Sequence, residues 1–121
     1  MYYRYEMIID NKKYGIFVGL EKIGLDEDIR FEICDYFDKY LPIPGFYYIK
    51  GKNGKKDIFA YFTEEGNEKF KNHITNLIDF IEKMGYKTLI TTQDKVGSRR
   101  LIYEDKYQAL ILKKGWLYVY Y

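Results

Sequence analysis

The segment from Thr63 to Gly85, TEEGNEKFKNHITNLIDFIEKMG, constrains the fold more than any other stretch of the chain. Its apolar residues recur at alternating spacings of four and three, which places them on one stripe of an α-helix. This stripe consists of Phe70, Ile74, Leu77, Ile81 and Met84. Thr63 can cap the first turn, and Gly85 suits the left-handed residue that follows a helix. The pattern therefore predicts a long helix that crosses a whole sheet and serves as the central support of the fold.

A second helix is predicted from Asp26 to Leu41, with Asp26 as its N-cap. The expected core stripe consists of Ile29, Ile33, Tyr36, Phe37 and Tyr40. Phe31, Cys34 and Leu41 do not lie on this stripe and give the helix a second apolar side. Such a side must be covered either by more of the same chain or by a partner.

Short segments rich in aromatic and β-branched residues predict the strands. They are residues 2–9, 14–20, 46–50, 57–62, 86–92, 100–103, 107–112 and 116–121. Asn53-Gly54 is the strongest hairpin signal, and most connections are short, so the sheet should be largely antiparallel. The expected fold is α+β, with a curved, largely antiparallel sheet, two helices packed against it and an element order that begins β-β-α-β-β-α-β-β-β. We expect residues 1–121 to form a single domain.

Composition reduces the number of protein classes to which the chain can belong. The net charge of +2 argues neither for nor against nucleic acid, and the N-terminus has no signal-peptide pattern. We therefore expect a cytoplasmic protein that neither enters a membrane nor carries a cofactor. One cysteine and one histidine argue against a disulfide framework, a zinc site and a thiol dyad. The chain has 15 tyrosines and eight phenylalanines, a number that fits either an interface or an A+T-rich coding sequence.

Two basic clusters are candidate anion sites. The first lies at the predicted hairpin tip and consists of Lys50, Lys52, Lys55 and Lys56. The second is the loop that contains Arg99 and Arg100, beside Gly97 and Ser98. Either cluster could bind a phosphate backbone or a nucleotide, although solvated lysines at a turn and an ordinary loop explain the same residues.

Three hypotheses of function follow. The first is a small non-enzymatic protein that binds a protein partner, such as an inhibitor or an immunity or anti-defence factor. Its expected contact residues are Phe31, Cys34, Leu41, Tyr47 and Tyr48. The second is a nucleotide or nucleic-acid binding protein that uses the two basic clusters and tyrosines of the sheet. The third is a small hydrolase or transferase that uses scattered acidic residues together with tyrosine or arginine. Self-association into a homodimer is compatible with the first hypothesis.

Overall fold

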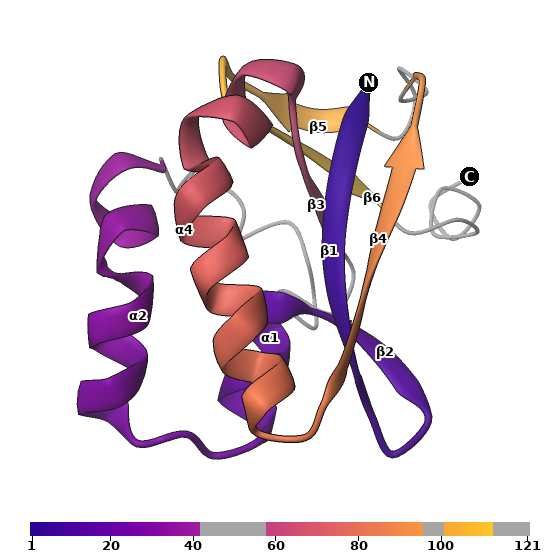
Figure 1. Ribbon diagram of the computed structural model, residues 1–121. Helices are drawn as coiled ribbons and strands as arrows, with labels where there is room; N and C mark the ends of the chain where they lie inside the picture. The colour runs from indigo at the N-terminus through magenta and orange to yellow at the C-terminus, as the bar shows by residue number, and fades with distance from the viewer. Residues whose placement is uncertain (42–57, 96–100, 113–121) are drawn as a thin grey trace.

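The computed structural model describes residues 1–41, 58–95 and 101–112, and within them it shows an α+β fold (Figure 1). The chain begins with strands β1 (Tyr2–Ile9) and β2 (Lys12–Gly15), followed by helices α1 (Ile16–Lys22) and α2 (Glu27–Tyr40). Strand β3 (Ile58–Phe62) then precedes the long helix α4 (Glu64–Lys83). Strands β4 (Lys87–Gln93), β5 (Leu101–Glu104) and β6 (Gln108–Leu112) follow. The predicted strands at 46–50 and 116–121 lie outside the described residues.

Strand β1 is the centre of the sheet. One edge of β1 pairs with β4 over seven residues, from Tyr2 opposite Gln93 to Ile8 opposite Lys87. Its other edge is shared by β2, which pairs with the second half of the strand, and by β3, which pairs at Tyr3. Beyond β3 lie β6 and β5, and every described pair is antiparallel. The predicted fold class and the predicted hairpin of the first two strands are therefore confirmed.

Helix α4 forms as predicted. The hydroxyl oxygen of Thr63 accepts the N–H of Gly66 at 3.0 Å, and Gly85 follows the helix with a φ of +96°. Its buried apolar residues are Phe70, Ile74, Leu77 and Ile81, while Met84 packs at the edge of the same core. Two tyrosines fix the helix to β1, because the hydroxyl of Tyr3 donates to Glu64 and that of Tyr5 donates to Asn67.

The predicted strand at 14–20 is wrong in its second part, because Ile16–Lys22 is helix α1. Ile16 and Leu20 are four residues apart and both are buried, which is the spacing of one helical face. Gly19 lies against Met7 of β1 so closely that a side chain at this position would overlap it. The same apolar residues also alternate with a period of two, which is why the sequence was compatible with a strand.

Helix α2 begins after Asp26, whose carboxylate accepts the N–H groups of Asp28 and Ile29, as predicted. The predicted core stripe is wrong at its edges, because Ile29 and Tyr40 are 42% and 44% exposed. Cys34 is buried instead and Leu41 packs against the core. Phe37 stacks on Phe70 of α4 and fixes the buried side, so the helix is rotated about its axis relative to the prediction.

Candidate functional site

The outer side of α2 carries the most exposed phenylalanine of the described chain. The residue is Phe31, which is 64% exposed. Figure 1 shows why this side is open: α4 lies between α2 and the strands, so the far side of α2 faces away from the rest of the described fold. A helix presents to solvent whatever its sequence places opposite the buried stripe, and Phe37 fixes that stripe against α4. Phe31 is therefore exposed because of the way in which α2 packs.

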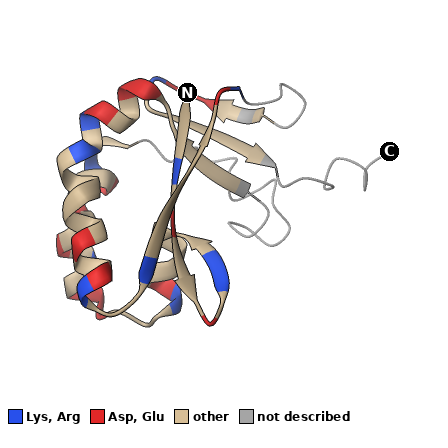
Figure 2. Ribbon diagram, turned by 45° about the vertical axis from the view of Figure 1, so that its right-hand side comes forward, with Lys and Arg blue, Asp and Glu red and all other residues tan. Residues whose placement is uncertain are grey.

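Carboxylates surround Phe31 on this surface. Residues three and four positions apart are neighbours on a helix, which places Glu27, Asp28 and Asp35 next to Phe31. Asp38 lies one turn further along the same side, and all four acidic residues are exposed. Figure 2 shows both acidic and basic residues along the helical side of the molecule. We call Phe31 with Glu27, Asp28, Asp35 and Asp38 the α2 acidic face.

Two of the predicted contact residues do not lie on this face. Cys34 is 5% exposed, and Leu41 is partly buried against the core. Burial raises the pKa of the Cys34 thiol to about 11, and the carboxylate of Asp38 contributes in the same direction. The thiol is therefore neutral at physiological pH, and the thiolate needed by a nucleophilic cysteine is scarce. The structure thus separates Phe31 from Cys34 and Leu41, which the sequence had placed on one side.

The other predicted site residues lie outside the described ranges. They are Tyr47, Tyr48, Lys50, Lys52, Lys55, Lys56, Arg99 and Arg100. The basic clusters at the predicted hairpin tip and in the loop before β5 therefore stay predictions.

His73 is placed by aromatic packing. Its ring stacks on Tyr36 with a centroid distance of 3.7 Å and an interplanar angle of 6°. It also meets the edge of Phe37 at 6.3 Å. His73 therefore lies at the junction of α2 and α4.

A shallow hollow of about 380 Å³ lies beside the start of α4, where the sequence predicted no site. It is lined by Glu65, Glu68, Lys69, Lys106 and Tyr107. The ammonium groups of both lysines lie over the ring of Tyr107, at 5.3 and 5.8 Å from its centroid. Lys106 also pairs with Glu65 at 3.6 Å. Acidic and basic groups are mixed in this hollow, so its charge does not favour a ligand of either sign.

A polar network lies on the sheet face opposite the helices. Arg4 donates through Nε to Glu6 at 3.2 Å and through Nη1 to the carbonyl of Ala60 at 3.2 Å. Its guanidinium also lies 4.4 Å from the ring centroid of Phe59. The other oxygen of Glu6 accepts the hydroxyl of Thr91 at 2.9 Å. These contacts tie β1 to β3 and β4, which indicates a structural role.

The acidic pair Glu104-Asp105 also has a structural role. Glu104 accepts the hydroxyl of Tyr2 at 2.6 Å, and this bond raises the pKa of the tyrosine. Asp105 lies in the turn between β5 and β6 and accepts hydrogen bonds from Tyr103, from the N–H groups of Tyr107 and Gln108, and from the Gln108 side chain. Burial alone would raise the pKa of Asp105, but these four bonds outweigh burial and lower it.

Several of the tyrosine hydroxyls thus have structural partners. Those of Tyr2, Tyr3, Tyr5 and Tyr103 donate to side chains, and that of Tyr61 accepts the Gln93 amide. The high tyrosine content therefore has a partly structural explanation within the described chain.

Within 1–41, 58–95 and 101–112, no helix combines the length and apolar character that a membrane span requires. The same residues contain no cluster of three or more His, Cys, Asp or Glu side chains that could bind a metal ion. Comparison of the chain with protein-family models, curated proteins and solved structures finds no match.

Proposed function

We propose that this chain is a non-enzymatic binding protein that docks on a basic protein surface through the α2 acidic face. The observation that supports the proposal is the exposure of Phe31 on a side of α2 that also carries four exposed carboxylates. Exposing a phenylalanine has a cost in water, and aromatic residues are enriched at the buried centres of protein interfaces. Phe31 would enter an apolar pocket of the partner.

The carboxylates define the chemistry of the partner. Glu27, Asp28, Asp35 and Asp38 would form a polar rim that steers a surface rich in lysine or arginine toward Phe31. The same charges disfavour nucleic acid on this face, because phosphates would be repelled. The specific form of the proposal is an inhibitor or an immunity-type factor, which acts by occupying the surface of another protein.

Photocrosslinking can identify the partner. A photoreactive phenylalanine analogue at position 31 should crosslink one protein in extracts of the source cells, whereas the same analogue at Ile29 should not. Ile29 is a matched control because it is also exposed but lies on another side of α2. The crosslinked protein would then be purified and its binding measured by calorimetry.

Three variants test the interface once the partner is purified. Phe31→Ala should weaken binding about tenfold or more, as expected for a central aromatic residue, and leave the melting temperature unchanged. The pair Asp35→Lys and Asp38→Lys should weaken binding most at low salt, whereas Glu68→Lys with Asp79→Lys on α4 should not. Unchanged affinity in Phe31→Ala would overturn the proposal.

The nucleic-acid alternative gives a different result. Binding to oligonucleotides that falls steeply with salt and is lost in Arg99→Ala with Arg100→Ala would favour that hypothesis. The proposal would also be overturned if oligonucleotides bind in this way and no protein is found that binds through Phe31.

A further inference from the structure

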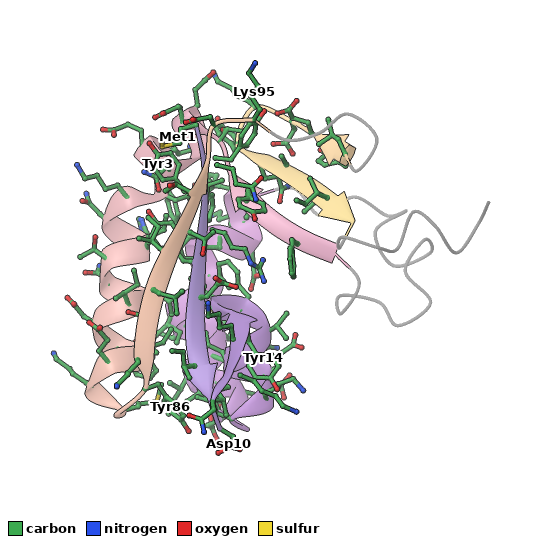
Figure 3. The ribbon with its side chains drawn as sticks, turned by 90° about the vertical axis from the view of Figure 1, so that its right-hand side faces the viewer. Met1, Tyr3, Asp10, Tyr14, Tyr86 and Lys95 are labelled. Carbon is green, nitrogen blue, oxygen red and sulfur yellow. The ribbon has the colours of Figure 1, made fainter. Side chains whose placement is uncertain are left out.

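Among the residues that the structure describes, strand β4 forms an open edge of the sheet. Within the described chain, β4 pairs with β1 and with no other strand. The pairing is regular over all seven residues from Lys87 to Gln93, without a bulge. In an edge strand, every second residue directs its N–H and C=O groups away from the sheet. Figure 3 looks onto this side of the molecule, where β4 runs between the labelled Tyr86 and Lys95.

This edge lacks the usual protection against pairing. Edge strands are commonly blocked by charged residues, prolines, bulges or short length. The sequence of β4 is KTLITTQ, so Thr88 to Gln93 contains neither a charge nor a proline. At the opposite end of the sheet, β5 has only four residues, and its register shifts between Leu101 and Tyr103. The edge at β4 is therefore better suited to accept another strand than the edge at β5.

An exposed isoleucine occupies the middle of this edge. Ile90 is 51% exposed and lies opposite Tyr5, so its side chain is on the same face of the sheet as the helices. Thr88 and Thr92 flank it on that face. Ile90 is also the central residue of β4, with three residues on each side.

We propose that β4 pairs antiparallel with β4 of a second copy of this chain and joins two sheets into one. A two-fold axis at the centre of β4 would place Ile90 opposite Ile90 of the second copy, and each isoleucine would cover the other. Thr88 would lie opposite Thr92 and Lys87 opposite Gln93, so no like charges would face each other. A single pair of strands of roughly 23 Å buries a small area, which predicts a dimer that dissociates on dilution.

Opposite charges introduced at position 90 test whether β4 is the dimer interface and whether Ile90 lies at the two-fold axis. Sedimentation velocity of the wild-type chain should show a mass that doubles as concentration rises. Ile90→Lys and Ile90→Glu should each stay monomeric, because like charges would meet at the axis. An equimolar mixture of the two variants should recover the dimer, and two unfolded variants could not complement each other in this way.

The exposed Ile29 on α2 supplies the matched control. Ile29→Glu should leave the wild-type dimer intact, because it changes an isoleucine of similar exposure away from β4. A wild-type chain that is monomeric at every concentration would overturn the inference. A dimer that survives in Ile90→Glu, or a mixture that stays monomeric, would also overturn it. Phe31→Ala should keep the dimer, so this test and the test of the α2 acidic face have separate outcomes.

Discussion

Gly66 in the first turn of α4 packs directly on the carbonyl group of Tyr107, and a side chain at this position would overlap that carbonyl. The carbonyl also accepts the N–H of Thr63 at 3.0 Å, and the hydroxyl of Thr63 donates to the carbonyl of Lys106 at 2.6 Å. The start of the helix is therefore fixed to the turn between β5 and β6 through the backbone carbonyls of Lys106 and Tyr107.

Replacing Gly66 with alanine should destabilise the protein. Alanine favours a helix, but its methyl group would force the helix away from Tyr107, at a cost of about 3 kcal/mol. Urea unfolding followed by circular dichroism measures the change. Glu65→Ala is the control at a neighbouring exposed position and should change stability by less than about 0.5 kcal/mol. Equal stability of the two variants would show that the helix can shift without cost.

Asp105 should stabilise the turn between β5 and β6 in a pH-dependent way. Its pKa is lowered in the folded chain, so its contribution is present above the unfolded pKa and is lost as pH falls through the folded value. Asp105→Ala should cost about 2 kcal/mol at pH 7, since it leaves several donors without an acceptor. The difference from wild type should shrink below about pH 4 in acid titrations of stability. A difference that is constant with pH would contradict this assignment.

Arg4 and Glu6 should be coupled energetically. Both side chains are 11% exposed, so Arg4→Met would leave a largely buried carboxylate with Thr91 as its remaining partner. We expect a loss of about 3 kcal/mol. Adding Glu6→Gln should recover part of this loss, because the amide carries no charge. A double-mutant cycle from urea midpoints measures the coupling, with Lys12→Met as an exposed control. Additive losses would show that the two residues act independently.

Cys34 should react slowly with thiol reagents in the folded protein. Burial raises its pKa from 9.0 to about 11, which by itself lowers the thiolate fraction about a hundredfold at pH 8. Labelling by a chromogenic disulfide should therefore be slow under native conditions and fast in urea. Comparison with a small free thiol provides the reference rate. Rapid labelling of the folded chain would indicate that Cys34 is accessible.

The sequence predicts an element most reliably where the spacing of its apolar residues fits only a helix or only a strand. The stripe of α4 from Phe70 to Ile81 fits only a helix, and both of its ends carry capping residues. Residues 14–20 fit both periods, and the helix that forms packs Gly19 against Met7, a contact that no local pattern contains. The rotation of α2 was missed for a similar reason, because Phe37 stacks on a residue from another helix.

The candidate site was only partly predictable. The second apolar side of α2 was visible in the sequence. The sequence did not show which residues of that side would be buried in the core. Phe31 remained on the surface, while Cys34 became part of the core. The Arg4–Glu6 pair could have been predicted from spacing, because residues two positions apart in a strand lie on the same face of the sheet. Its link to Thr91 joins residues 85 positions apart, a distance that no spacing rule spans.

The pairing of β1 with β4 also determines when the centre of the sheet can form. The ribosome makes β1 before β4, and β4, which pairs with β1 over seven residues, ends at Gln93. During synthesis, the edge of β1 that pairs with β4 therefore stays unpaired until Gln93 has emerged. Such distant pairing slows folding and leaves strand edges open to aggregation. Slow translation or chaperone binding before residue 93 should consequently affect the yield of native protein more than the same event later.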